Sequence, residues 1–194
     1  MDNTNFHSSK YWEKRYYEGG NSGSGSYGKS AKFKANFLNK FVEEKSIKSI
    51  VEFGCGDGNQ LLLAQYLNYT GYDVSQTSVN LCKEIFINDE SKKFYHLNDY
   101  NNEKFDLSLS LDVVYHLIEQ DVYLDHLQKL FNSSKDYVII YSTNTKFNFL
   151  YKKHLFHRMF TNDVANFFPN FTLIETYKSK PIFSTLSFYI YKKS

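Results

Sequence analysis

A glycine-rich turn directly after a short apolar stretch constrains this chain more than any other feature. Residues 49–53 read SIVEF, and glycines follow at positions 54, 56 and 58. Glycines at the end of a buried strand let the backbone turn tightly and approach a ligand without a Cβ in between. A helix that begins behind them would offer free N–H groups to the same ligand. The pattern therefore predicts a strand–turn–helix unit that holds a small molecule.

Hydrophobic spacing along the rest of the chain predicts strands that alternate with helices. We expect strands over 49–53, 69–73, 93–96, 105–111, 137–142, 171–178 and 184–192, and helices over 30–44, 60–67, 75–87 and 121–131. A further helical region is expected after 142, up to about 168. Alternation predicts parallel pairing with right-handed crossovers. The last two strands have no full helix between them, which predicts an antiparallel hairpin. The expected fold class is α/β, a Rossmann-like, doubly wound sheet of seven mostly parallel strands.

Length and composition fit one domain. The chain has 194 residues, of which 42% are hydrophobic and 23% charged, a globular composition. Its first residues are polar, its two cysteines are too few for a disulfide framework, and no apolar run approaches the ~20 residues of a membrane span. We therefore expect a cytoplasmic protein with a single domain over 1–194. Within it, 1–29 is expected to form a helix and a Gly/Ser-rich lid, and 145–168 a helical insert that binds the substrate.

Charge is distributed unevenly. The formal net charge of +2 gives no general case for nucleic-acid binding. From Lys146 onward, however, there are 8 Lys and Arg against 2 Asp and Glu. Two explanations stay open at this point, solvated lysines on late strands and loops, or a C-terminal third that faces an anionic substrate.

Acidic residues around the glycine turn narrow the ligand. The dinucleotide fingerprint needs a third glycine at position 59, which is Asn59 here, and this disfavours a nicotinamide oxidoreductase. Glu52, just before the turn, would repel a pyrophosphate but could accept from a cationic amino group. Asp73 lies where an acid binds ribose hydroxyls in related folds, and Asp99 is placed to meet an adenine amino group. The implied ligand is an adenosine that carries an amino acid.

Two segments carry a resemblance to a known family. Residues 51–58, VEFGCGDG, resemble motif I of the class I S-adenosylmethionine (SAM)-dependent methyltransferases, and residues 105–117 look like the fourth-strand motif of that family. The resemblance implies SAM as cofactor and S-adenosylhomocysteine (SAH) as product. It implies cofactor contacts from Tyr11, Arg15, Glu52, Gly54, Cys55, Gly56, Gly58, Gln60, Asp73, Val74, Asp99, Tyr100 and Leu111. In that family the N-terminal segment folds over the cofactor, where Arg15 would pair with the SAM carboxylate.

A closer resemblance concerns the methyl acceptor. Residues 11–16, 19–28 and 154–161 are similar to a bacterial subgroup often associated with glycosyltransferases and surface-polysaccharide synthesis. This implies a small hydroxylated, possibly anionic acceptor, such as a sugar, a nucleotide sugar or a glycan end. The alternatives are a non-catalytic SAM-binding subunit, and methylation of nitrogen in a small molecule or in nucleic acid. Nucleic-acid enzymes of this fold carry a Pro-Pro-aromatic motif where this chain has residues 112–115, DVVY.

Histidines and one arginine are the candidate acceptor-side residues. His116 follows the fourth expected strand and could serve as the general base, with a rate that rises through pH ~6–7; the alternative is a histidine that only packs. Substrate-binding roles are expected for Tyr115, His154, His157 and Arg158, the last because guanidinium suits phosphate or carboxylate. His154 and His157 lack further zinc ligands nearby, so no metal is predicted. The sequence does not predict an oligomeric state.

Overall fold

The computed structural model describes residues 6–148, 153–178 and 185–194. Its α-helices are α1 (Ser8–Tyr17), α2 (Gly28–Glu44), α3 (Gln76–Ile85), α4 (Gln120–Asn132) and α5 (Phe160–Phe167). Its strands are β1 (Ser49–Phe53), β2 (Asn68–Asp73), β3 (Lys92–His96), β4 (Phe105–Leu111), β5 (Ser134–Ser142), β6 (Phe171–Lys178) and β7 (Ser187–Lys193). Short 3-10 turns, η1 (Ser24–Ser26), η2 (Leu61–Leu63), η3 (Leu97–Asp99) and η4 (Val114–His116), lie between them.

The strands form one seven-stranded sheet in the order β3-β2-β1-β4-β5-β7-β6. Strands β1 to β5 pair in parallel, and β7 runs antiparallel to both β5 and β6. The expected fold class, a doubly wound, mostly parallel sheet with an antiparallel C-terminal strand, is confirmed. The order reverses between β1 and β4, and ligands in such sheets bind at the carboxyl ends of the strands beside that point.

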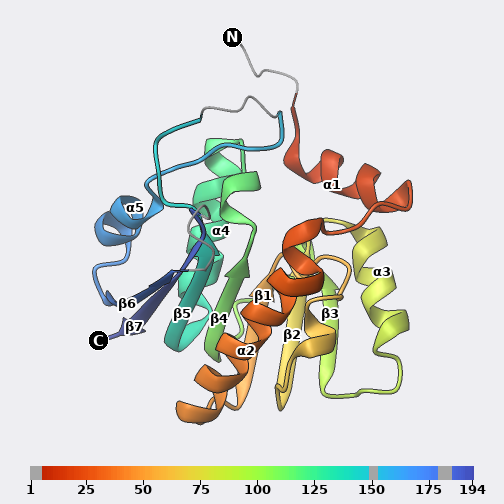
Figure 1. Ribbon diagram of the computed structural model, residues 1–194, viewed down its shortest axis with the longest axis horizontal. Helices are drawn as coiled ribbons and strands as arrows, with labels where there is room; N and C mark the ends of the chain where they lie inside the picture. Colours follow the sequence, from red (N-terminus) through yellow and green to blue (C-terminus); the bar gives the residue numbers. More distant parts are fainter. Residues whose placement is uncertain (1–5, 149–152, 179–184) are drawn as a thin grey trace.

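Helices cover both faces of the sheet and give three layers (Figure 1). On one face, Leu38 of α2 and Val79 of α3 pack with Ile50 and Leu109. On the other, α4 and α5 pack against the opposite sides of the same strands, and Leu127 is among the fully buried side chains there. Each such side chain contributes about 1.5–3 kcal/mol on burial. The two apolar layers fix the strand ends, while α1 lies beyond the carboxyl edge of the sheet (Figure 1).

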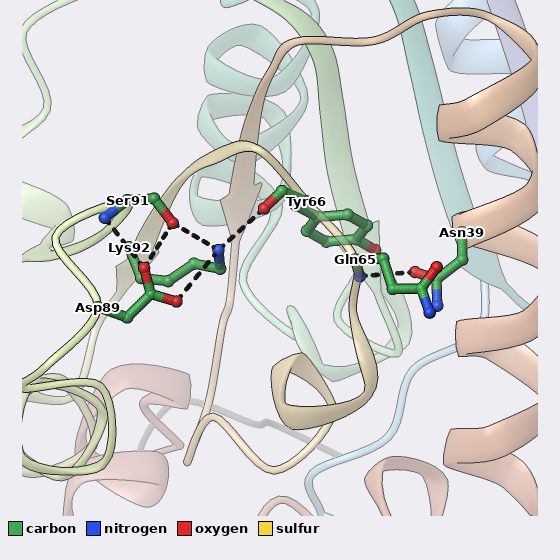
Figure 2. Close-up of polar contacts among 6 residues, drawn as sticks. All are labelled: Asn39, Gln65, Tyr66, Asp89, Ser91 and Lys92. Carbon is green, nitrogen blue, oxygen red and sulfur yellow. Dashed lines mark hydrogen bonds and ion pairs between the residues drawn. The ribbon is translucent and has the colours of Figure 1, made fainter.

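The amino ends of β2 and β3 are tied together away from that edge (Figure 2). Lys92, at the first residue of β3, donates from Nζ to the carbonyl of Tyr66 at 3.0 Å and pairs with Asp89 at 3.4 Å. Gln65, the residue before Tyr66, donates from its backbone N–H to Asn39 Oδ1 of α2 at 3.0 Å. The Lys92 side chain is only 7% exposed. Its hydrogen bond to Tyr66 ties the turn before β2 to β3, and the bond from Gln65 to Asn39 ties the same turn to α2.

Two expected helices differ from the structure. The helix expected over 60–67 is only the single turn η2, because the chain becomes extended at Ala64 (φ −87°, ψ 145°) to enter β2 at Asn68. The 145–168 insert is helical only in α5 among its described residues. Before α5 its backbone N–H groups have partners outside a helix, since Thr145 N donates to Arg158 O and Phe156 N to Tyr115 O.

Two of the expected elements extend into residues that the structure does not describe. Residues 149–152 of the insert, and residue 184 at the start of the last expected strand, lie outside the described ranges.

Within the described ranges, none of the helices combines the length and the apolarity that crossing a membrane requires.

Candidate active site

A cavity opens at the carboxyl edge of the sheet, beneath α1. Its walls come from the glycine turn after β1, the ends of β2 and β4, and the N-terminal segment 8–26. Nine residues predicted from the sequence line it, namely Glu52, Gly54, Cys55, Gly56, Gln60, Asp73, Val74, Leu111 and His116. Segments far apart in the chain therefore meet at the point where the strand order reverses.

The glycine turn is packed on both sides. A Cβ on Gly54 (φ +91°) would lie 2.4 Å from Val113 Cγ2, and one on Gly56 (φ +57°) would lie 2.4 Å from Ser22 Oγ. Both positions combine a left-handed backbone with a neighbour that leaves no room for a side chain. The turn thus lies between the end of β4 and the N-terminal segment, with its backbone exposed to the cavity.

Asp73, the last residue of β2, is buried and hydrogen-bonded to the turn. Its Oδ2 accepts from Gly56 N at 2.9 Å, and its Oδ1 accepts from Ser75 N at 2.9 Å. Burial raises the pKa of this carboxyl, and the two backbone N–H groups oppose that effect. A carboxylate has about four acceptor positions, so Asp73 keeps acceptor capacity on the cavity wall. Such an acceptor suits ribose hydroxyls.

Glu52, in β1, is the second buried acid of the cavity. Tyr69 donates from its hydroxyl to Glu52 Oε2 at 2.7 Å. Burial raises the pKa of Glu52 to about 7, although the Tyr69 hydroxyl and the Lys34 ammonium act in the opposite direction. The group therefore changes charge near neutral pH, and a cation placed beside it would favour its ionised form.

The N-terminal segment is fastened over the glycine turn. Glu13 of α1 accepts from the hydroxyls of Ser75 and Thr77 at 2.6 Å each, at the N-terminus of α3. Asp57, in the glycine turn, accepts from the Tyr27 hydroxyl at 2.8 Å. The 1–29 segment predicted as a lid therefore covers the cavity through its described residues, from position 6 onward. Its opening and closing stay a prediction.

His116, in η4, lines the cavity as a neutral imidazole. Its Nδ1 lies 2.8 Å from the carbonyl oxygen of His154. A carbonyl can only accept, so Nδ1 carries the proton and Nε2 carries the lone pair. Burial lowers the pKa of His116 to about 4. This pKa is lower than the ionisation at pH ~6–7 expected from the sequence, because the ring is largely removed from water.

Aromatic rings surround His116. Trp12 meets it edge-on with ring centroids 5.0 Å apart, and the His154 ring is stacked at 5.6 Å. Tyr11 in turn stacks on His154 at 5.0 Å. Trp12 lines the cavity, whereas Tyr11 does not contact it directly. The result is an aromatic wall, Tyr11, Trp12, His116 and His154, where α1 meets the 145–168 insert.

Arg158 contacts the protein's own backbone. Its Nη1 and Nη2 donate to the carbonyls of Leu117 and Ile118 at 2.5 and 2.9 Å, and its guanidinium lies 4.4 Å from the Tyr123 ring centroid. It does not line the cavity. These contacts hold the segment after η4, and the predicted acceptor contact of Arg158 stays a prediction.

The other predicted acceptor residues also lie outside the cavity lining. Tyr115 donates to Asp112 Oδ1 at 2.8 Å, and His157 Nδ1 lies 2.7 Å from Thr143 Oγ1. His154 reaches the site through its ring and its carbonyl, both of which contact His116. Their acceptor roles stay predictions.

Five predicted cofactor residues do not line the cavity. They are Tyr11, Arg15, Gly58, Asp99 and Tyr100. Asp99 is exposed because the turn η3 brings Leu97 to the cavity instead. Arg15 Nε donates to Asn21 O at 2.6 Å and so fixes the chain after α1. The proposed adenine and carboxylate contacts of Asp99 and Arg15 therefore lack support from the geometry.

Sequence reasoning missed several lining residues. Lys34 and Asp112 form a buried ion pair at 2.6 Å on the cavity wall. Lys34 lies one turn after buried Ala31 and one turn before buried Leu38. A lysine at an apolar position of an amphipathic helix is the sequence pattern that could have indicated it. Asp112 has a φ of +60°, and no sequence pattern predicted that backbone.

Comparison with known proteins assigns the class. The family model described as a methyltransferase domain matches residues 28–178, and the chain belongs to this family. The predicted resemblance to the class I SAM-dependent methyltransferases is thereby confirmed. None of the curated proteins matches the chain.

Solved structures share the fold at low sequence identity. The magnesium protoporphyrin IX methyltransferase of Synechocystis PCC 6803, with bound SAM, is 14% identical over 100% of both chains with a TM-score of 0.70. The N-methyltransferase NodS of Bradyrhizobium japonicum WM9, in complex with SAH, is 11% identical over 97% of this chain and 99% of that chain, with a TM-score of 0.72. The prediction of SAM as cofactor agrees with both neighbours.

Proposed function

We propose that this protein transfers a methyl group from SAM to a hydroxyl of a small acceptor, namely a sugar, a nucleotide sugar or a glycan end. The observation that carries the proposal is His116, a neutral imidazole on the cavity wall whose Nδ1 proton is held by the His154 carbonyl at 2.8 Å. This leaves Nε2 as an acceptor for a hydroxyl proton. Membership of the methyltransferase domain family supports the reaction class.

Asp73 and the glycine turn are suited to hold the adenosine part of the cofactor. The carboxylate of Asp73 lines the cavity as an acceptor suited to ribose hydroxyls, and the apolar side chains of Val74, Leu97 and Val113 line the same cavity. When bound, SAM supplies a methyl group already activated on a sulfonium. The remaining task of the protein is to align an acceptor and to accept one proton.

His116 is suited to that proton because it is neutral. A protonated ring would repel the sulfonium, and its pKa of about 4 keeps it uncharged at physiological pH. Such a pKa makes His116 a weak base. An acceptor hydroxyl becomes acidic only while its oxygen bonds to the methyl group, so a weak base at Nε2 can take the proton late in the transfer.

The aromatic wall favours a sugar-like acceptor over a strongly anionic one. Rings such as Trp12 can cover the apolar face of a sugar, while polar groups at its edge meet its hydroxyls. Arg158, for which the sequence predicts a contact with an anionic group, donates to two backbone carbonyls. We therefore place the acceptor beside Trp12 and His116, with the link to surface-polysaccharide synthesis resting on the sequence resemblance.

A product assay tests the proposal. The protein is incubated with SAM and with panels of sugars, nucleotide sugars and small amines, and SAH formation and the methylated product are measured by mass spectrometry. We expect methylated sugar hydroxyls, and loss of turnover by ~10²–10⁴ in His116→Asn. SAH formation only with amines would replace the hydroxyl by a nitrogen acceptor. Binding of SAM without turnover in any panel would favour a SAM-binding subunit.

A further inference from the structure

One basic side chain, that of Lys34, lines the cavity. Among the described residues that line the cavity, Lys34 is the only lysine or arginine. It comes from α2, and its side chain is 1% exposed. Burying an ammonium is costly unless it is paired, so its position on the cavity wall needs an explanation.

Asp112 explains only part of that position. Lys34 Nζ donates to Asp112 Oδ2 at 2.6 Å, and Asp112 also accepts from the Tyr115 hydroxyl. An ammonium has three donors. Among the described residues Asp112 is its hydrogen-bond partner, and the ammonium also lies 5.5 Å from the centroid of the Tyr141 ring. Donor capacity of Lys34 therefore remains for an anionic group of a ligand.

A second polar side chain of the cavity, Gln60, has one buried atom without a partner among the described residues. Gln60 Nε2 donates to the carbonyl of Ala31 at 3.1 Å, one turn before Lys34 on α2. That bond fixes the amide, and its Oε1 is buried on the cavity wall with no hydrogen-bond partner in the described part of the chain. A buried acceptor of this kind points to a donor supplied by the ligand. Glu52, nearby in β1, adds an acidic group to the same wall.

We infer that Lys34 is the residue that binds the carboxylate of the cofactor's amino-acid tail, while Gln60 Oε1 and Glu52 face its ammonium. The inference rests on the proposed SAM site and reassigns the carboxylate partner from Arg15 to Lys34. Lys34 is then the residue that selects a cofactor with an intact amino-acid tail over one that carries adenosine alone.

The test compares two ligands on several variants by calorimetric titration. SAH carries the amino-acid tail, and 5′-methylthioadenosine shares the adenosine and sulfur but lacks the tail. In Lys34→Met, SAH should bind about tenfold to a hundredfold more weakly, as for a lost hydrogen bond between charged groups, and 5′-methylthioadenosine should bind as before. Lys40→Met, on the exposed side of the same helix, should leave both affinities unchanged.

Removal of Lys34 leaves the carboxylate of Asp112, whose side chain is 11% exposed, without its cation, so folding needs its own control. The double variant Lys34→Met with Asp112→Asn removes both charges, and its Asn oxygen can still accept from Tyr115. It should show the same selective loss of SAH. Equal losses for the two ligands, or no loss, in a folded variant would overturn the role of Lys34. If the unmodified protein binds neither ligand, the proposed function itself fails.

Discussion

The protonation of His116 can be measured directly without knowing the acceptor. Nitrogen-resolved NMR of the imidazole rings should show His116 with its proton on Nδ1 at pH 7, because the His154 carbonyl accepts there. The pKa of about 4 implies that about 97% of the ring is neutral at pH 5.5. A histidine with an ordinary pKa of ~6.5 would be only about 10% neutral at that pH. The His116→Asn variant assigns the signal.

The same pKa makes a prediction about stability. The unfolded chain binds a proton at His116 near pH ~6.5, whereas the folded chain does so only near pH 4. The stability due to the neutral ring is therefore complete above pH ~6.5 and is lost as the pH falls toward 4. At pH 5, His116 alone lowers the free energy of unfolding by about 2 kcal/mol relative to pH 7. Urea unfolding at pH 7 and pH 5 measures it, and His116→Asn should remove that part of the difference.

One outcome would refute this reasoning. A midpoint at pH 6–7, or a proton on Nε2 at neutral pH, would mean that His116 is solvated and not held by His154. The ring would then be charged over part of the working range, and the general-base role would need the pH profile first expected from the sequence.

Three further predictions concern other parts of the site. Asp73→Ala should weaken SAH binding about tenfold to a hundredfold by calorimetry, since ribose hydroxyls lose a charged partner, while Asp99→Ala should not change it. Hydrogen exchange of residues 19–28 should slow when SAH binds, if this segment is a lid; equal rates would exclude that role. Arg158→Lys should lower Tm, by about 2–4 °C for each kcal/mol of unfolding free energy lost, because lysine cannot repeat the paired donation to the carbonyls of Leu117 and Ile118. An unchanged Tm together with a raised KM for the acceptor would instead support the predicted acceptor role.

The sequence was most informative where a pattern is local. The strands at 49–53, 105–111 and 171–178 agree with β1, β4 and β6 at both ends, because short apolar or alternating runs end at glycines, turns or charges. The helix expected over 60–67 was wrong because Leu61, Leu62 and Leu63 are consecutive and only the first is buried. Their hydrophobicity suggested a helix, but their spacing does not build an apolar face.

The site residues, like the strands, were predicted best where their position depends on the local sequence. Glu52, Gly54, Gly56 and Asp73 were found because the turn and the strand end position them through the local backbone. Lys34 joins the cavity only through the packing of α2 against the sheet, and this depends on tertiary structure. Asp99 follows β3 as expected, but the η3 turn leaves its side chain exposed, so its predicted contact with adenine stays a prediction.

The segment fastened over the glycine turn has a consequence for substitutions made in it. The family model begins at residue 28, whereas Trp12, Tyr16 and Ser22 on the cavity wall all precede it. Part of the cavity wall therefore lies outside the stretch that the family model covers. Ser22 packs against Gly56 of the glycine turn, and Trp12 packs against His116. A substitution in this segment would therefore act on the turn or on the proposed acceptor side of the cavity, while the hydrogen bonds of Asp73 to Gly56 and Ser75 come from outside the segment.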